Sequence, residues 1–200
     1  MNEKIRHILE QINALEEEIE SVLNEQRGKL FYQLHGKQVE FERSIRDAHR
    51  RLKVGLFRWF LTTRPQNYLT APIIYGMIVP LALLDLSISF YQMSCFPIYG
   101  ISKVKRSGYF SFDHRHLAYL NIIEKFDCVY CSYANGLLAY SSEIVARTEQ
   151  YFCPIKHAQK IKGTHARYQY FLDYGDAEDL HKMLEEIRVS LISEQENLSK

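Results

Sequence analysis

Hydrophobic residues near the start of the chain recur in alternating steps of three and four. They are Ile5, Ile8, Ile12, Leu15, Ile19 and Val22. This spacing is that of the core positions of about three heptads, and Glu16, Glu17 and Glu18 project outward from it. The pattern predicts a helix that pairs either within its own chain, as a helical hairpin or bundle, or with a second copy as a coiled coil.

A second amphipathic pattern lies near the C-terminus. Its hydrophobic positions are Leu180, Met183, Leu184, Ile187 and Leu191. These positions share one face of a helix, so we expect a C-terminal helix that would lie against the first one.

Between about residue 38 and residue 60 the chain becomes basic and then apolar. The basic residues are Arg43, Arg46, Arg50, Arg51 and Lys53. Lys and Arg side chains meet lipid phosphates at a membrane surface, and Trp favours the boundary of the hydrocarbon. We therefore expect Arg58, Trp59 and Phe60 to lie at a membrane interface, with a buried helix end as the alternative.

The longest apolar stretch runs from residue 71 to residue 101 and contains one charged residue, Asp85. A bilayer core is crossed by about 20 apolar residues, so the stretch is long enough to span it. However, Pro72 and Pro80 interrupt helical hydrogen bonding, and a carboxylate at mid-membrane must be shielded. These features argue against a plain span.

Basic residues flank this stretch on both sides. They are Arg58 and Arg64 before it, and Lys103, Lys105 and Arg106 after it. Positive charge on both sides favours two cytoplasmic ends. We therefore predict a membrane-inserted, re-entrant hairpin bent near Pro80, with Asp85 facing protein. A single span and the buried core of a soluble oligomer are the alternatives.

Two further helices are predicted in the C-terminal half. Leu117, Leu120, Ile123 and Phe126 lie at helical spacing in residues 116–126, and residues 137–152 form the second helix. The pair Asn135-Gly136 predicts a turn or a break between them, and Pro154 limits the second.

Cysteine and histidine residues form two closely spaced pairs, Cys128-Val-Tyr-Cys131 and Cys153-Pro-Ile-Lys-His157. Three thiolates and one imidazole are a ligand set typical of tetrahedral zinc, and iron is the second choice. A redox-active Cys128 and Cys131 pair opening a helix, or buried inert thiols, are the other interpretations. Cys95, inside the apolar stretch, is interpreted as a small hydrophobic residue.

The spacing sets a condition on this metal site. In one straight helix Cys131 and Cys153 would be about 33 Å apart, at about 1.5 Å per residue. A four-ligand site therefore requires a break near Asn135-Gly136 or later, or ligands from two subunits. If Asn135-Gly136 were the turn of a helical hairpin, His114 and His116 would become the alternative ligands beside Cys153 and His157.

Charge and composition exclude some classes of function. The net charge of +1 lacks the basic excess of a nucleic-acid binder. The charged N-terminus predicts no secretory signal, so a disulfide framework is not expected of the four cysteines. Glu143, Arg147 and Glu149 are interpreted either as a solvated helix face or as an ion-pair network that supports metal ligands. Phosphate-binding and nucleophile motifs are absent from the sequence, which leans against an enzyme.

Two segments of this chain resemble a bacterial protein family that carries no assigned activity. They are the run from Cys128 through Ser-Tyr-Ala-Asn to Gly136, and the run from Ala146 through Glu149-Gln-Tyr-Phe-Cys153 to His157. The similarity extends upstream to residues 70–72 and 96–100, but the heptads of the N-terminus lie outside it. The resemblance implies a bacterial origin and no mechanism.

Together these patterns predict a mainly α protein in four parts. They are a coiled-coil or hairpin region (1–50), an interfacial and membrane-embedded region (51–107), a Cys/His helical module (108–175) and a C-terminal helix (176–200). We expect a self-associating accessory or assembly protein of the bacterial inner membrane with a structural zinc ion and both termini in the cytoplasm. A redox enzyme at the membrane surface and a lipid-shaping scaffold are the alternatives.

Overall fold

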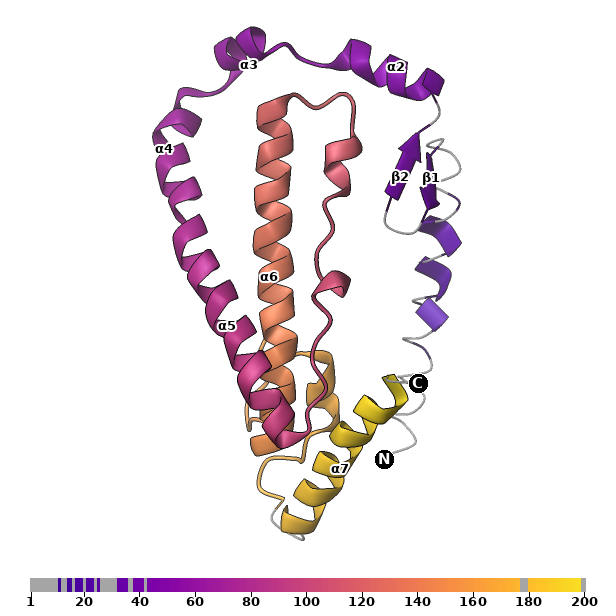
Figure 1. Cartoon of the computed structure of the whole chain (residues 1–200), viewed down its shortest axis with the longest axis vertical. Helices are drawn as coiled ribbons and strands as arrows, with labels where there is room; N and C mark the ends of the chain where they lie inside the picture. Colours follow the sequence, from indigo (N-terminus) through magenta and orange to yellow (C-terminus); the bar gives the residue numbers. More distant parts are fainter. Residues whose placement is uncertain are drawn as a thin grey trace. The chain divides into compact units, whose positions relative to one another are not determined.

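The computed structural model shows a mainly helical protein (Figure 1). The structure describes residues 11, 14–15, 17–19, 21–23, 25, 32–35, 38–41, 43–176 and 180–198. The chain divides into two compact units, residues 1–62 with 112–129 and residues 63–111 with 130–200. The long helix α6 (Ile122–Phe152) belongs to both.

The first unit contains a β-hairpin that the sequence pattern assigned to a helical region. Strands β1 (Tyr32–His35) and β2 (Gln38–Phe41) pair antiparallel, with Tyr32 opposite Phe41. Aromatic or aliphatic residues alternate with polar ones on both strands, which is a strand period rather than a helical one. The prediction that residues 1–50 are helical throughout is therefore wrong at this hairpin.

Among its described residues from 43 onward, the first unit also contains three short helical elements besides the start of α6. They are α2 (Arg43–Leu52), α3 (Leu56–Thr62) and the 3-10 turn η2 (Asp113–His116). β2 contacts η2, and the His49 ring meets the Tyr119 ring edge to face at 5.2 Å between centroids. These contacts join the two separate stretches of chain that make up this unit.

The described residues between 11 and 25 are helical, as the heptad pattern predicts. Leu15, Ile19 and Val22 are exposed on this stretch, whereas Ile5, Ile8 and Ile12 lie outside the described residues. The partner of this apolar face, whether in the same chain or in a second copy, stays a prediction.

Two long helical segments run side by side in the same direction in the second unit (Figure 1). The first consists of α4 (Pro65–Gly76) followed by α5 (Ile78–Tyr99), and the second is α6. The Tyr75 ring meets the Tyr130 ring at one end, and Tyr99 meets Tyr151 at the other, with centroids 5.7 and 5.2 Å apart. Because the helices are parallel, the chain must travel back along them.

The return begins at Gly100, whose φ of 65° is in the left-handed region that favours glycine. We call residues 100–111 the return segment. It includes the 3-10 turn η1 (Arg106–Gly108) and runs antiparallel to α5, since Ile101 N donates to Phe96 O and Val104 N donates to the Gln92 side chain.

The predicted hairpin bend near Pro80 is wrong. Only Met77 separates α4 from α5, and its φ of −63° and ψ of −13° keep the chain in the helical region, so the direction does not reverse. Pro80 is the third residue of α5, a position where the missing N–H would have no helical partner in any case. Pro80 is therefore compatible with the first turn of α5 and does not reverse the chain.

The predicted break at Asn135-Gly136 is also wrong, because α6 is continuous from Ile122 to Phe152. A Cβ added at Gly136 would lie 2.7 Å from Tyr109 O and 2.9 Å from Phe110 Cδ1. Glycine at this position lets the return segment approach the helix backbone. Gly136 is therefore a close packing contact between α6 and the return segment. It is not the turn of a helical hairpin.

The helix predicted from residue 116 begins later, at Ile122. Asn121 is its N-cap: Asn121 Oδ1 accepts hydrogen bonds from Ile123 N and Glu124 N, and Glu124 Oε2 accepts one from Asn121 N. This is a capping box, in which two unpaired donors of the helix start are satisfied reciprocally.

The core of the second unit lies between α5, the return segment and α6. Its buried hydrophobic residues are Phe96, Ile101, Val104, Leu137, Tyr140, Ile144 and Leu191. Leu191 belongs to α7 (Leu180–Leu198), so the predicted C-terminal helix is confirmed and its apolar face points inward. Between α6 and α7 lie η3 (Ala166–Tyr170) and a parallel bridge from Ile155 to Leu172.

Candidate functional site

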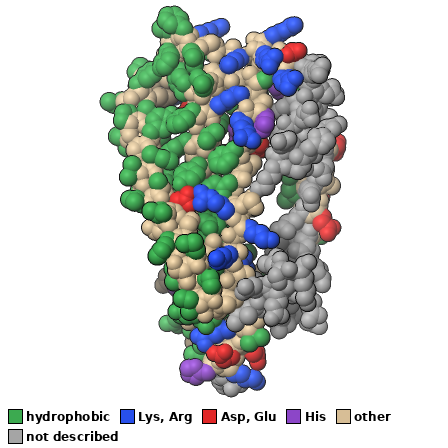
Figure 2. Space-filling model, in the orientation of Figure 1, with side chains coloured by type: hydrophobic (Ala, Val, Ile, Leu, Met, Phe, Trp, Pro, Cys, Tyr) green, Lys and Arg blue, Asp and Glu red, His purple; other side chains and the backbone are tan. Residues whose placement is uncertain are grey.

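The outer side of α4 and α5 carries a continuous row of exposed hydrophobic side chains. We call this row the apolar stripe, and it consists of Leu69, Ile73, Val79, Leu83, Leu86, Phe90 and Met93. Its residues in α5 follow one another in steps of four and three, which places them on one face of the helix. Figure 2 shows hydrophobic side chains covering the side formed by α4 and α5, with Lys and Arg side chains next to them.

The one charged residue of the helix from Pro65 to Tyr99 points away from this stripe. Asp85 accepts two hydrogen bonds from the Arg106 guanidinium, each 2.5 Å long, and one of 2.9 Å from the Tyr133 hydroxyl. Ser89 donates a fourth at 3.3 Å. The carboxylate is thus neutralised by the return segment and by α6.

The donors around Asp85 keep their protons. The hydrogen bond to Asp85 raises the pKa of Arg106, and burial, followed by the hydrogen bond to Asp85, raises the pKa of Tyr133. Arg106 also stacks over the Phe110 ring, with its guanidinium carbon 4.5 Å from the ring centroid. These contacts hold the return segment against α5 and α6.

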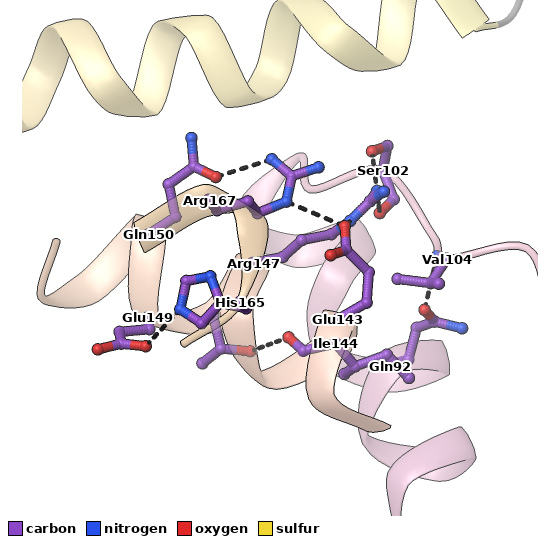
Figure 3. A network of polar contacts seen from close by, with 11 residues as sticks. Gln92, Ser102, Val104, Glu143, Ile144, Arg147, Glu149, Gln150, His165 and Arg167 are labelled. Carbon is purple, nitrogen blue, oxygen red and sulfur yellow. Dashed lines mark hydrogen bonds and ion pairs between the residues drawn. The ribbon is translucent and has the colours of Figure 1, made fainter. Parts of the chain in front are cut away.

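A network of polar side chains lies around the C-terminal part of α6 (Figure 3). Arg147 donates to the Glu143 carboxylate at 2.8 Å and to the Ser102 carbonyl at 2.7 Å. Arg167 donates to the same Glu143 oxygen at 2.9 Å and to Gln150 at 2.8 Å. Both guanidinium groups are largely buried, so the network joins α6 to the return segment and to η3.

His165 and Glu149 form a second pair within this network, with His165 Nε2 3.0 Å from a Glu149 oxygen (Figure 3). The Val104 N–H donates to Gln92, whose amide nitrogen in turn donates to the Tyr140 hydroxyl. Gln92 and Arg147 therefore satisfy backbone groups of the return segment that no helix or sheet satisfies.

The four predicted metal ligands do not meet within one chain. Cys128 and Cys131 lie on the same continuous helix as Phe152, which directly precedes Cys153, so the two halves are about 33 Å apart at about 1.5 Å per residue. Among the residues that the structure describes, no three His, Cys, Asp or Glu side chains are placed to hold one ion.

The alternative ligands are engaged locally instead. His114 Nδ1 lies 3.2 Å from the Asp113 carboxylate, and His116 Nε2 accepts a hydrogen bond from Arg115. Both residues are in η2, in the first unit. His157 belongs to the second unit, where its ring stacks on Tyr168 at 6.3 Å.

The predicted membrane-interface residues differ in their surroundings. Arg58 and Phe60 are exposed on α3, and Trp59 is partly buried. Lys103 and Lys105 are exposed on the return segment, whereas Arg106 forms an ion pair with Asp85.

No protein-family profile, curated protein or solved structure matches the chain. The resemblance to a bacterial family therefore stays a prediction, and the function must be inferred from the geometry.

Sequence reasoning missed the residues that organise the site. Arg167 and His165 were not singled out, because a basic and aromatic stretch gives no sign of the two α6 carboxylates that it contacts. The Asp85 and Arg106 pair had a signal: one charge in an apolar helix implies a counterion, and the nearest cations in the sequence follow that helix.

Proposed function

We propose that this protein is a membrane-associated accessory or scaffold protein that places the apolar stripe in lipid and carries its polar helical module at the membrane surface. The observation that carries the proposal is the contrast between the two sides of one helix. Its only charge is paired inward with Arg106 and Tyr133, while the apolar stripe has no cover among the described residues.

Exposed side chains of this size are costly in water. Leu69 is 80% exposed and Leu86 is 70% exposed. Burying one such side chain gains about 1.5 to 3 kcal/mol, and a contiguous row of this kind marks an interaction surface. Lipid is the partner that suits a stripe with no polar group in it.

Aromatic clusters at the two ends of the paired helices support the same partner. Tyr75 and Tyr130 meet at one end, and Tyr99, Tyr151 and Phe152 meet at the other. Aromatic side chains of this kind concentrate at the boundary between hydrocarbon and headgroups.

The helix from Pro65 to Tyr99 is long and apolar enough to cross a membrane. Its 35 residues extend about 52 Å, whereas the hydrocarbon core is about 30 Å thick. The apolar stripe from Leu69 to Met93 extends about 36 Å, so a perpendicular helix would leave about 6 Å of the stripe outside the hydrocarbon core. A helix lying along the surface would bury the whole stripe.

The return segment supports this lengthwise orientation. Lys105 and residues 106–108 after it are exposed, and Arg106 lies against Asp85 near the middle of the helix. Exposed non-helical backbone and an ammonium group are not tolerated against lipid at mid-membrane depth. With the helix along the surface, these groups reach water and lipid phosphates.

The position of the two α6 cysteines does not support the redox alternative. Cys128 and Cys131 lie beyond the first turn of α6, so the free N–H groups of the helix start do not stabilise a thiolate there. Glu143, Arg147 and Arg167 bond to one another and to the backbone, as structural groups do.

Tryptophan scanning tests the proposal. Trp59 is the only tryptophan, so the Trp59→Phe variant has no tryptophan fluorescence. Into this variant we would introduce Leu69→Trp, Leu83→Trp or Ile98→Trp, one at a time. These sites lie about 21 Å apart along the helix. In vesicles of phosphatidylcholine and phosphatidylglycerol, lipids brominated at different depths should quench all three at one shallow depth.

The control is Tyr174→Trp, in an exposed loop after η3, which should not be quenched. A crossing helix would instead give the greatest depth at residue 83. Absence of quenching at every site would contradict membrane association itself.

A further inference from the structure

A second exposed row lies on α6. Cys131, Leu138, Val145 and Phe152 recur every seven residues, and all four are exposed. Asn135, Ser142 and Glu149 lie between them, so the row as a whole advances in steps of four and three. That is the spacing of a helix-pairing seam. We call these seven residues the α6 seam.

The middle of the α6 seam, from Leu138 to Val145, lies on the side of the helix away from the core, whereas at its C-terminal end Glu149 meets His165 and Phe152 meets Tyr99. Leu137, Tyr140 and Ile144 are buried against α5 and the return segment, and the helical period places the seam opposite them. The middle of the seam carries Ser142 beside Ala139, both small and exposed, so the backbone of another helix can approach closely there.

The seam is symmetric about its centre between Ser141 and Ser142. If a second copy of α6 packs against it antiparallel about a two-fold axis at that point, Leu138 faces Val145 of the second copy. The same register places Cys131 opposite Phe152 of the second copy, and Phe152 is followed directly by Cys153.

We propose that two copies of this chain bind zinc between them through this seam. Cys128 and Cys131 of one copy and Cys153 and His157 of the other form each site. The two-fold axis makes two equivalent sites in one dimer, one at each end of the seam. The seam thus brings together two ligand pairs that stand at opposite ends of α6 in a single chain.

The half-site of Cys128 and Cys131 has a spacing that a tetrahedral ion can use. Cys128 and Cys131 are three residues apart on one helix, so their Cβ atoms are about 5 to 6 Å apart on the same face. Cys131 and Cys153 are free, exposed thiols. They release their protons to solvent when they ligate the metal.

The other half-site is held in place by its own contacts. Cys153 N donates to Glu149 O at 2.7 Å, and His157 N donates to the Tyr168 hydroxyl at 2.6 Å. The stack of the His157 ring on Tyr168 fixes the ring near its backbone. Three thiolates and one imidazole then complete a closed zinc set.

Complementation between two variants tests the proposal. One chain carries Cys128→Ser with Cys131→Ser, the other carries Cys153→Ser with His157→Ala, and the two have different affinity tags. Each variant alone should lose its zinc. A heterodimer isolated through both tags should regain half of the wild-type zinc per chain, because one of its two sites has four native ligands.

A seam variant separates assembly from ligation. Leu138→Asp leaves all four ligands in place, but it should abolish both the dimer and the zinc. Val189→Asp, which changes an exposed residue of α7 in the same way, should leave both unchanged. Cys95→Ser should also retain zinc. Zinc content is read by elemental analysis after purification in detergent with reductant and added zinc, and mass by light scattering.

Three results would overturn the proposal. They are a metal-free wild-type protein, a monomeric Leu138→Asp variant that keeps its zinc, and a heterodimer that regains none. Since the measurements are made in detergent, they are independent of how the apolar stripe meets lipid, and either proposal can fail alone.

Discussion

Gly136 shows how a single residue type changes meaning between sequence and structure. Next to asparagine it is a turn signal, and the sequence alone has no way to weigh that signal against burial. In the structure the absent Cβ makes room for Tyr109 and Phe110 of the return segment. Glycine lowers the intrinsic stability of a helix, but at this position it leaves room for the backbone of the return segment.

Gly136→Ala should therefore destabilise the fold by up to about 2 kcal/mol. Overpacking costs about 1 to 3 kcal/mol, and the better helix propensity of alanine offsets about 1 kcal/mol of that. At Gly76, also helical, an added Cβ would have nothing within 4 Å, so Gly76→Ala should leave stability unchanged or slightly raised. Denaturant unfolding of both variants measures the difference, and equal effects would contradict the packing role.

At the scale of elements, sequence periodicity predicted helices well and their ends poorly. The spacing of Leu180 to Leu191 predicted α7 and its inward face, because that face is decided by burial alone. The start of α6 was missed although Asn121 and Glu124 form a recognisable capping pair. The hairpin bend at Pro80 was wrong because proline near a helix start is compatible with a helix.

The candidate site was harder to predict than the helices. Ligand spacing identified Cys131 and Cys153, but their separation depends on whether α6 is continuous, which the packing of Gly136 decides. Similarly, the partners of Glu143 come from α6 itself and from η3, and only the tertiary fold places Arg167 beside it. Local pattern predicts which residues carry chemistry, and long-range packing decides which of them meet.

The Asp85 and Arg106 pair is predicted to hold the return segment on α5. Asp85→Asn removes the charge and leaves a partly exposed guanidinium without its carboxylate, so we expect a loss of about 1 to 2 kcal/mol, less than for a fully buried pair. Arg106→Gln alone and with Asp85→Asn completes a double-mutant cycle in thermal unfolding.

The matched control is Asp47→Asn in α2, where Asp47 and Arg50 form an exposed pair 3.5 Å apart. That change should alter stability by less than about 0.5 kcal/mol. A double-mutant cycle with no coupling between Asp85 and Arg106 would show that the return segment is held by its apolar contacts alone.

At the scale of the whole molecule, the lengthwise orientation predicts that both chain ends lie on the same side of the membrane. Cysteines introduced near Lys4 and Lys200 in a background without native cysteines should react with an impermeant maleimide only from the cytoplasmic side. The basic residues on both flanks of the apolar helix give the physical reason for the side. Labelling of the two ends from opposite sides would instead establish a single crossing.

The return segment also has a consequence for the order in which the protein is made. The Ser102 carbonyl accepts a hydrogen bond from Arg147, 45 residues later in the chain. The Gln92 amide nitrogen donates to the Tyr140 hydroxyl, 48 residues later. During synthesis the return segment therefore leaves the ribosome well before its partners in α6 exist. Until Arg147 emerges, water must satisfy that backbone, which delays burial of the segment until nearly all of α6 has been translated.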